Sequence, residues 1–235
     1  MPTSVIVLAA GLGSRMNSDL PKVLHPLAGV PMLHHALAAA RSLDPARIVV
    51  VAGHGADQVT RAALAFDDGV EVVIQAEQLG TAHAVLQAAP ALAGATGPAI
   101  VLYGDTPFVQ AGTLATMLSA LDRAQVVALG FHAADPGRYG RLVVEGEALH
   151  RIVEARDATP AELAITLCNS GVMACDAALL IDLAAGVGAA NAQGEYYLTD
   201  IVGLARGRGL SAGVVICNEA ETLGIDTRTA LARAE

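Results

Sequence analysis

The chain has 235 residues, of which 54% are hydrophobic and 16% are charged. These apolar side chains suffice for one large core or two modest ones, which excludes an intrinsically disordered chain. The formal net charge of −9 and the aromatic content of 3% argue against DNA or RNA as a partner, because a polyanion would be repelled and stacking platforms are scarce. A phosphate-bearing ligand would need local cations, backbone N–H groups or a metal ion.

Cysteine usage and hydropathy indicate a cytoplasmic protein. Cys168, Cys175 and Cys217 show no C-x-x-C spacing, so we expect reduced thiols rather than a disulfide framework or zinc site. The first residues lack the basic segment of a signal peptide. The long uncharged stretch at 78–104 is interrupted by prolines and glycines, so we expect no membrane contact.

Strands and helices are expected to alternate through the first half of the chain. Val- and Ile-rich runs without polar alternation predict strands buried on both faces, at residues 4–9, 47–52, 70–75 and 99–103. Helices are expected between them, at 31–43, 57–65 and 81–88, the first with Pro31 at its first position. This order predicts an α/β fold with a Rossmann-like, doubly wound and mostly parallel sheet.

The second half of the chain shows a different pattern of apolar and polar residues. After a further strand at 125–132, the segments 141–145 and 148–154 alternate apolar with polar residues around Gly146, as a half-exposed hairpin does. The remaining expected elements are a strand at 165–174, helices at 176–184 and 197–205, and a strand at 210–217. We predict a single domain, residues 1–235, with a small β-rich lobe.

A glycine-rich segment follows the first predicted strand. Residues 8–16 read Leu-Ala-Ala-Gly-Leu-Gly-Ser-Arg-Met, and Lys22 follows shortly after. Such a turn lets backbone N–H groups approach phosphate oxygens, while Arg15 and Lys22 add positive charge. A dinucleotide fingerprint would need glycine where Met16 stands, and no Gly-Lys-Ser/Thr follows for a P-loop. A simple turn is the other interpretation.

Two further segments lie at strand ends. Residues 75–83 read Gln-Ala-Glu-Gln-Leu-Gly-Thr-Ala-His, where amides could hydrogen-bond the edge of a base. From the residues alone, Thr81 acting only as a helix N-cap is the favoured interpretation. Asp105 ends another strand, and ligands gather beyond the carboxyl ends of parallel strands. Asp105 is therefore a candidate Mg²⁺ ligand, and Asp226 is the candidate for a second; each could instead cap a turn or helix.

Together these motifs resemble the sugar-1-phosphate nucleotidylyltransferases. Gly-x-Gly-Ser-Arg-Met with a following Pro-Lys is similar to their signature, and Gln-Ala-Glu-Gln-Leu-Gly-Thr is similar to the uracil-binding segment of the bacterial N-acetylglucosamine-1-phosphate uridylyltransferases. Tyr-Gly-Arg at 139–141, Asn-x-Gly at 169–171 and Gly-Glu-Tyr-Tyr-Leu-Thr-Asp at 194–200 extend the resemblance over nearly the whole chain. Asp226 departs from it, because that family usually carries Asn there.

The resemblance implies a role for each group of residues. The implied catalytic residues are Arg15 and Lys22, and the implied Mg²⁺ ligands are Asp105 and Asp226. The implied nucleotide-binding residues are Leu8, Ala9, Ala10, Gly11, Gly13, Ser14, Gln75, Gly80 and Thr81. The implied sugar-binding residues are Tyr103, Gly104, Gly140, Glu154, Asn169, Tyr197 and Thr199. The nucleotide part would cover about 1–110, the sugar part about 111–227, and the start of a C-terminal helix 228–235.

The implied reaction joins UTP to N-acetylglucosamine 1-phosphate, giving UDP-N-acetylglucosamine and pyrophosphate with Mg²⁺ as cofactor. Two alternatives stay open: transfer to another sugar 1-phosphate, such as that of N-acetylmuramic acid or glucose, and a nucleotide-sugar sensor without turnover. The family usually carries a second half, a left-handed β-helix with acetyltransferase activity. Because the sequence stops at Glu235, we expect no acetyl transfer and a monomer or weak dimer.

Overall fold

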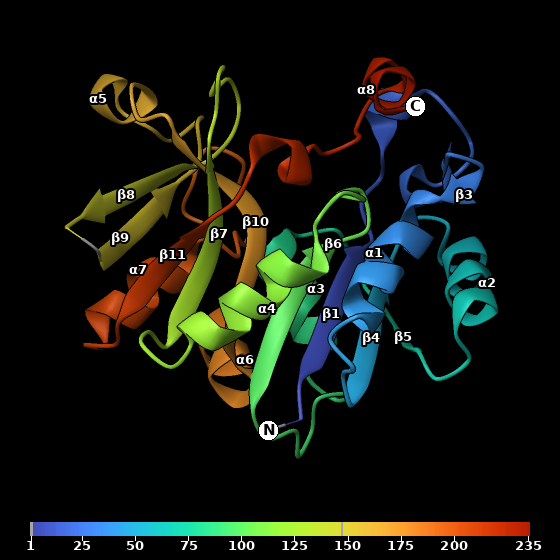
Figure 1. Cartoon of the computed structure of the whole chain (residues 1–235), viewed down its shortest axis with the longest axis horizontal. Coiled ribbons are helices and arrows are strands. Elements are labelled where there is room, and N and C mark those ends of the chain that lie inside the picture. Colours follow the sequence, from blue (N-terminus) through green and yellow to red (C-terminus); the bar gives the residue numbers. More distant parts are fainter. Residues whose placement is uncertain (1, 147) are drawn as a thin grey trace.

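The structure is a computed structural model that describes residues 2–146 and 148–235 (Figure 1). Two residues lie outside the described part of the chain. They are Met1, in the segment that is expected to lack a signal peptide, and Glu147, beside the predicted turn at Gly146. Among the helices described, none is long and apolar enough to cross a membrane.

A large, mostly parallel sheet forms the centre of the protein. Its strands are, in spatial order, β11 (Ala212–Ile216), β7 (Val126–His132), β10 (Leu167–Asp176), β6 (Pro98–Tyr103), β1 (Ser4–Ala9), β4 (Arg47–Ala52) and β5 (Glu71–Ile74). β10 runs antiparallel to both of its neighbours, whereas the other pairs in this row are parallel. The predicted α/β sheet is therefore confirmed, with one inverted strand in its middle.

Burial on both faces explains why the apolar runs became inner strands. In β1, Val5 and Val7 face one hydrophobic core while Ile6 and Leu8 face the other, and all six residues of the strand are buried. The prediction of burial on both faces is wrong for β5, whose side chains are half-buried or exposed. Among the described strands, β5 pairs only with β4, so it forms an edge of the sheet.

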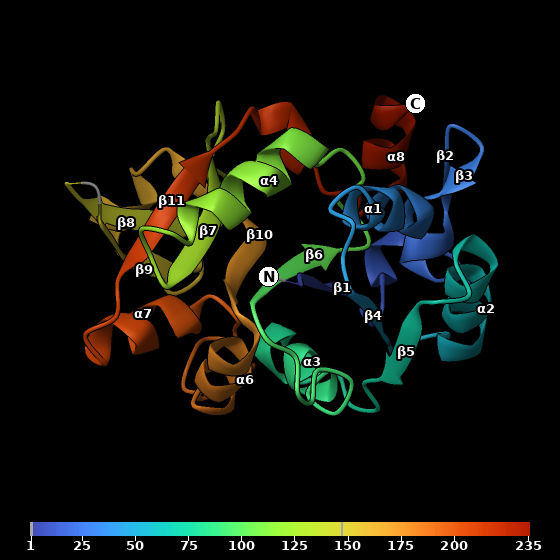
Figure 2. The ribbon, with the colours of Figure 1, turned by 60° about the horizontal axis from the view of Figure 1, so that its bottom comes forward.

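Helices cover the two faces of the sheet (Figure 2). One core holds α1 (Met32–Arg41), α2 (Ala56–Phe66) and α4 (Ala111–Ala120), and the other holds α3 (Thr81–Gln87), α6 (Ala177–Ala185) and α7 (Asp200–Gly207).

Three details of these helices differ from the sequence-based expectations. Pro31 has ψ 137° and precedes α1 instead of occupying its first position. α7 begins at Asp200, so Tyr197 and Thr199 lie before the helix, not within it. α4 was not predicted, because its sequence, AGTLATMLSA, carries only a weak apolar stripe.

The predicted hairpin forms the β-rich lobe at one side of the sheet. β8 (Arg141–Glu145) pairs with β9 (Ala148–Val153), and the Arg141–Cys168 pair joins β8 to β10. Leu142, Leu149 and Ile152 are buried in the shared core, whereas Glu145 is exposed, as a half-exposed hairpin requires. The short helix α5 (Pro160–Leu163) follows the lobe.

The C-terminal helix lies over the loops that leave the sheet (Figure 1). α8 (Arg228–Ala234) confirms the predicted helix, and its Leu231 and Ala234 pack with Leu27 and Met32. Leu27 belongs to a small hairpin of β2 (Pro26–Leu27) and β3 (Val30–Pro31). Three 3₁₀ helices, at Ser14–Met16, Lys22–Leu24 and Glu219–Thr222, complete the described elements.

Strand order reverses at β1. The chain passes from β1 to β4 and β5 on one side and returns to β6 on the other side of β1. In open parallel sheets, ligands bind beyond the carboxyl ends of the strands at such a reversal. The glycine-rich loop follows β1 and Asp105 follows β6, so both segments leave the sheet at this point.

Candidate functional site

The glycine-rich loop curls back onto Lys22. Gly13 adopts φ 60°, and a Cβ placed there would lie 2.6 Å from the Lys22 Cβ. The Gly13 carbonyl accepts a hydrogen bond from the Met16 N–H at 2.8 Å, which starts the 3₁₀ helix Ser14–Met16. Only glycine fits this close, left-handed turn without strain. The loop and the lysine therefore form one unit.

Lys22 is paired with the carboxylate that ends β6. Its Nζ donates to the Asp105 Oδ2, and the two side chains are only 17% and 18% exposed. A pair this sheltered interacts more strongly than a pair on the surface, because less water screens it. Asp105 makes this ion pair instead of the turn or cap that the sequence left open.

A second ion pair joins Arg15 to Asp226. The backbone places Asp226 beside Asp105, since the Ile225 N–H donates to the Asp105 carbonyl oxygen at 2.9 Å. Asp226 follows the 3₁₀ helix Glu219–Thr222 instead of a strand, and it is not the cap of α8. That cap is Thr227, whose Oγ1 accepts from the Ala230 N–H at 3.0 Å.

These residues line one cavity of about 440 Å³, which we call the loop cavity. The predicted residues that line it are Leu8, Ala9, Ala10, Gly11, Gly13, Ser14, Arg15, Lys22, Gln75, Gly80, Thr81, Tyr103, Asp105 and Asp226. All nine predicted nucleotide-binding residues, both predicted catalytic residues and both predicted metal ligands are therefore brought together.

Gln75, Gly80 and Thr81 form one end of the loop cavity. The Gln75 side chain is buried, and its Nε2 lies 3.1 Å from the Gly80 carbonyl oxygen. Gly80 precedes α3, and the Thr81 Oγ1 accepts from the Leu198 N–H at 2.8 Å. Thr81 is thus not the helix cap considered from the sequence. Instead it attaches this end of the cavity to the segment before α7.

A second cavity, of about 980 Å³, opens between the sheet and the lobe, and we call it the lobe cavity. It shares with the loop cavity the residues Ser14, Arg15, Lys22, Tyr103, Asp105 and Asp226. Glu154 lines its far side. The two cavities therefore meet at the two ion pairs.

Glu154 is a half-buried acceptor at the base of the lobe. The Thr199 Oγ1 donates to its Oε1 at 3.2 Å. Burial, with smaller contributions from Asp200 and Asp157, raises the pKa of Glu154 above its ordinary value, and the Thr199 hydrogen bond opposes that shift. Glu154, Tyr197 and Thr199 also line an adjoining cavity of about 450 Å³.

Two tyrosines of the predicted sugar set are half-buried, and the hydroxyl oxygen of Tyr197 is itself buried. The hydroxyl of Tyr197 has no hydrogen-bond partner within the described part of the chain. Desolvation by burial raises the pKa of Tyr103, and the Glu154 charge adds to the shift. The Tyr103 ring lies against Gly171, where a Cβ would come within 2.7 Å of the ring Cε2.

Three predicted residues lie behind the cavity walls. Gly104 donates its N–H to the Leu8 carbonyl at 2.9 Å, and the Gly140 carbonyl accepts from the Asn169 N–H at 2.8 Å. A Cβ at Gly140 would lie 3.4 Å from the Glu154 Oε1. None of Gly104, Gly140 and Asn169 lines a cavity described above, so they support the wall from behind.

The donor set around the ion pairs fits a small divalent cation. Asp105 and Asp226 offer carboxylate oxygens, and across residues 2–146 and 148–235 no cluster of three or more His, Cys, Asp or Glu exists. Mg²⁺ is commonly held by one or two carboxylates together with substrate phosphates and water. Two carboxylates at the wall of a cavity suit this mode of binding.

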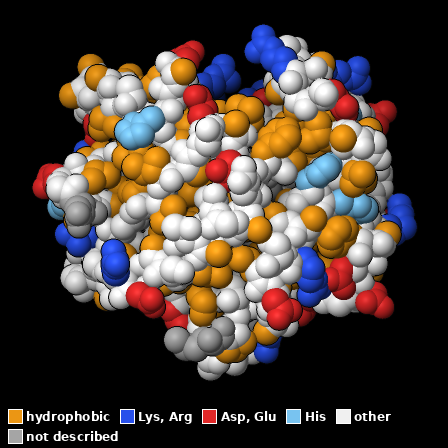
Figure 3. All heavy atoms as spheres, viewed as in Figure 1, with side chains coloured by type: hydrophobic (Ala, Val, Ile, Leu, Met, Phe, Trp, Pro, Cys, Tyr) orange, Lys and Arg blue, Asp and Glu red, His pale blue; other side chains and the backbone are white. Residues whose placement is uncertain are grey.

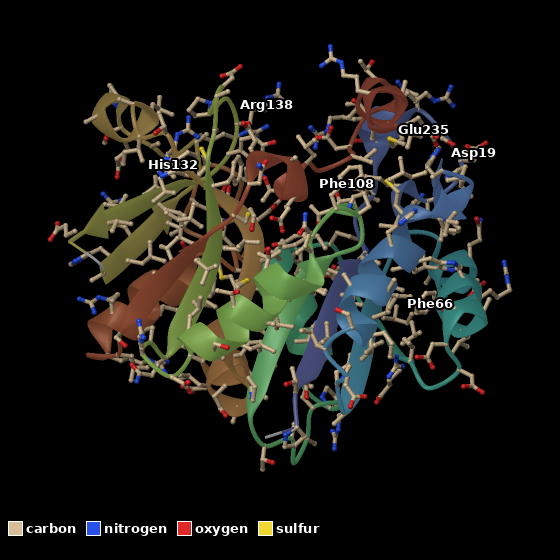
Figure 4. All side chains as sticks on the ribbon, viewed as in Figure 1. Asp19, Phe66, Phe108, His132, Arg138 and Glu235 are labelled. Atoms are coloured by element: carbon tan, nitrogen blue, oxygen red, sulfur yellow. The ribbon has the colours of Figure 1, made fainter. Side chains whose placement is uncertain are left out.

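Arginines that the sequence reading did not single out also line the lobe cavity. Arg138 and Arg156 lie on the lobe side, and Gln78 and Glu195 line the loop cavity. Figure 4 shows Arg138 at the rim, in the loop between β7 and β8. Arg138 directly precedes the Tyr-Gly-Arg segment in the sequence, and this position could have identified it as a residue of the site. Figure 3 shows the molecular surface notched near this rim, between the lobe and α8.

Comparisons with known proteins agree with this geometry. Residues 5–159 match the MobA-like NTP transferase domain. The chain is 68% identical over 232 residues to the bifunctional protein GlmU of Cereibacter sphaeroides, which covers 99% of this chain and 51% of that protein. It is 59% identical over 235 residues to GlmU of Roseobacter denitrificans, covering 100% of this chain and 52% of that one.

The chain thus spans about half the length of the curated relatives it matches. A solved structure, the inositol-1-phosphate CTP transferase from T. maritima, superposes with a TM-score of 0.75 at 19% identity, covering 97% of this chain and 90% of that one, which shows a common fold. The relatives confirm the resemblance inferred from the motifs. The chain belongs to the MobA-like NTP transferase domain family.

Proposed function

We propose that the chain transfers a uridylyl group from UTP to N-acetylglucosamine 1-phosphate, giving UDP-N-acetylglucosamine and pyrophosphate. One observation carries the proposal: the glycine-rich loop, Lys22, Asp105 and Asp226 line a cavity that ends in the amide of Gln75. Its dimensions and donors suit a nucleoside triphosphate. The GlmU relatives support nucleotidyl transfer to a sugar phosphate.

The chemistry asks the protein for position and charge. A phosphate oxygen of the sugar phosphate attacks the α-phosphorus of UTP in line, a new P–O bond forms, and the bond to pyrophosphate breaks. Lys22 stabilises the α-phosphoryl group, while Arg15 and the N–H groups of Gly11 to Ser14 hold the β- and γ-phosphates. Gly13 keeps the loop close enough to Lys22 for both to reach one triphosphate.

Asp105 and Asp226 would hold Mg²⁺. When bound, the ion would supply positive charge that stabilises the reacting phosphates. In the structure each carboxylate is paired with a cationic side chain, Asp105 with Lys22 and Asp226 with Arg15. With Mg²⁺ and a nucleotide bound, the two carboxylates would hold the metal and Lys22 and Arg15 would hold the phosphates, which is an exchange of partners. This exchange avoids leaving any of the four charges unpaired.

The sugar is proposed to lie in the lobe cavity and to reach the adjoining cavity of about 450 Å³. Glu154 lines both of these cavities and Thr199 lines the adjoining one, so both supply acceptors for hydroxyl groups. Tyr103 lines both the loop cavity and the lobe cavity and so forms the wall between them. Tyr197 brings a buried hydroxyl that lacks a partner in the part of the chain that the structure describes. Gly104, Gly140 and Asn169 act from behind as supports that shape this wall.

The composition of the chain supports a proposal for its partners, localisation and oligomeric state. Two small molecules, UTP and the sugar phosphate, are the partners, in a cytoplasmic protein that is a monomer or weak dimer. A net charge of −9 and three cysteines without C-x-x-C spacing support this view. Light scattering tests the oligomeric part, and a stable trimer would contradict it.

A pyrophosphate-release assay tests the reaction. ATP, CTP, GTP and UTP are each combined with the 1-phosphates of N-acetylglucosamine, N-acetylmuramic acid and glucose, with and without Mg²⁺. Release with UTP, N-acetylglucosamine 1-phosphate and Mg²⁺ above all other combinations supports the proposal. A different best sugar would reassign the acceptor. Nucleotide binding without any release would identify a sensor.

A further inference from the structure

The side-chain amide of Gln75 is held in one orientation from inside the protein. Its Nε2 lies 3.1 Å from the Gly80 carbonyl oxygen and 2.9 Å from the Nδ1 of His83. A carbonyl oxygen can only accept, so the atom that faces it must be the amide nitrogen. Both hydrogens of that nitrogen are then used. The Oε1 is the polar atom of this amide that remains for a ligand.

This arrangement requires the Nδ1 of His83 to be an acceptor. The neutral ring then carries its hydrogen on Nε2. The Nε2 of Gln87 also approaches the ring, 3.2 Å from the His83 Nε2, and it donates to the His83 carbonyl at 3.0 Å. A neutral imidazole has one acceptor nitrogen, so only one glutamine can donate to it. The contact from Gln75 is the shorter of the two and comes from a buried side chain, so we infer that the Nδ1 of His83 accepts from Gln75.

The surrounding backbone fixes the position of both groups. The ring of His83 lies 6.5 Å from that of Tyr196, centroid to centroid. The Tyr196 N–H donates to the Leu79 carbonyl at 2.8 Å, and its carbonyl accepts from the Ala82 N–H at 2.9 Å. Gly80, at φ 119°, passes so close to Tyr196 that a Cβ would lie 2.5 Å from its carbonyl oxygen. The His83 ring therefore has a rigid frame.

The cavity then offers an acceptor next to a donor. The acceptor is the Oε1 of Gln75, and the donor is the Gly80 N–H, which has no partner among the hydrogen bonds of the described residues. Both residues line the loop cavity. Uracil presents an N3–H beside a carbonyl oxygen, which matches this pair. Cytosine presents a bare N3, so its lone pair would face the Oε1.

We propose that His83 is a positioning residue for base choice: by accepting from Gln75, it keeps the Oε1 turned to the base and so favours uracil over cytosine. The inference rests on the proposed function, because it concerns the nucleotide of that reaction. His83 does not line the loop cavity, so it would act on a nucleotide there only through Gln75. Without its acceptor, the amide of Gln75 gains freedom to turn and present its nitrogen to cytosine.

Three variants test the role of His83. His83→Phe keeps a ring against Tyr196 but has no acceptor. We expect the ratio of kcat/KM for UTP to kcat/KM for CTP to fall about 3- to 10-fold, mostly through a change in KM, because that is the effect of losing one hydrogen bond. His83→Asn places an amide oxygen near the Nδ1 position and is expected to keep the ratio. Gln87→Ala, which removes the other amide at the ring, is the matched control and is expected to leave it unchanged.

A measurement on the unaltered protein complements the variants. The ¹⁵N resonances of the His83 imidazole report its tautomer, and we expect hydrogen on Nε2. Hydrogen on Nδ1, or a His83→Phe variant that retains the UTP preference, would overturn the inference. A wild-type chain without any preference for UTP would instead overturn the proposed function. The tautomer readout needs no variant, so a misfolded His83→Phe protein leaves the inference open to refutation.

Discussion

The two ends of the site handle their carboxylates in opposite ways. At the loop cavity, Asp105 and Asp226 are each paired with a cation. At the lobe, Glu154 and Asp200 are paired with no Lys or Arg in the described residues, and burial raises the pKa of both. One end holds balanced charge, and the other holds carboxylates that have lost part of their hydration.

This contrast indicates different ligand chemistry at the two ends. Paired charges can exchange partners with a metal and phosphates at little cost, because every charge keeps a counter-ion. A half-buried carboxylate without a cation gains from hydrogen-bond donors such as hydroxyl groups. The loop cavity is therefore suited to anions with a cation, and the lobe to a neutral polyhydroxyl group.

Removing the charge at the phosphate end is expected to have the largest effect. A preorganised donor of this kind stabilises a transition state by about 3–4 kcal/mol, so Lys22→Ala should lower kcat about 10²- to 10³-fold. Pyrophosphate release measures it, with exposed Arg123→Ala as control. Lys22 is the only lysine in the sequence, so amine labelling with mass spectrometry also reports whether UTP protects it. An unaltered kcat would refute its assignment.

The wall between the two ends is tested by Gly171→Ala. Gly171 has φ 94°, and the added methyl would meet the Tyr103 ring. We expect unfolding free energy to fall by about 1–3 kcal/mol from the backbone strain, with a larger loss where the ring must move. Urea denaturation measures it. Gly188→Ala is the control, since a Cβ there meets nothing within 4 Å. Equal midpoints for the two variants would contradict the packing argument.

Neutralising one carboxylate sharpens the charge comparison. Asp226→Asn keeps the shape of the side chain but removes the charge that pairs with Arg15. A site with fewer negatively charged ligands binds a cation more weakly, so the Mg²⁺ concentration that gives half of the maximal rate should rise about 3- to 10-fold. A Mg²⁺ titration of the rate measures it, with exposed Asp122→Asn as control. No change in the titration would remove Asp226 from the proposed ligands.

The link between α8 and the loop predicts a smaller effect. The Arg228 Nε donates to the Met16 carbonyl at 3.0 Å and its Nη2 to the Asn17 carbonyl at 3.2 Å. Arg228→Ala should lower the unfolding free energy by about 1 kcal/mol, since these bonds are partly exposed to water. Thermal unfolding measures it against Arg233→Ala on the same helix. Equal effects of the two substitutions would argue against this link.

A pH series tests the lobe. Because burial raises the pKa of Glu154, the folded state binds its proton more tightly than the unfolded state. The stability linked to this proton is therefore present below the ordinary carboxyl pKa and is lost as pH rises through the raised value. Glu154→Gln should flatten this decline and be more stable than the wild type near neutral pH. Parallel denaturation curves from pH 4 to 8 measure it; an unchanged slope would count against the burial effect.

Local sequence patterns were enough for most of the helices and strands, although not for α4, and together with the motif resemblance they identified most of the residues that line the loop cavity. Apolar runs require burial, and chain order with parallel strands requires their carboxyl ends to share one edge, so Gly13, Lys22 and Asp105 could be predicted to meet. The edge position of β5 could not be read from its Val-Val-Ile run, because a run does not say how many neighbours a strand has.

What only the tertiary structure decided is the partner of each polar group. The sequence alone determined that Thr81, Asp105 and Asp226 follow or precede regular elements, where capping is the default. In the fold, Thr81 instead accepts a hydrogen bond from Leu198, and Asp105 and Asp226 form ion pairs with Lys22 and Arg15. Hydrogen bonds and ion pairs act over a few ångströms and join segments up to about two hundred residues apart in the chain, so they depend on packing and not on sequence spacing.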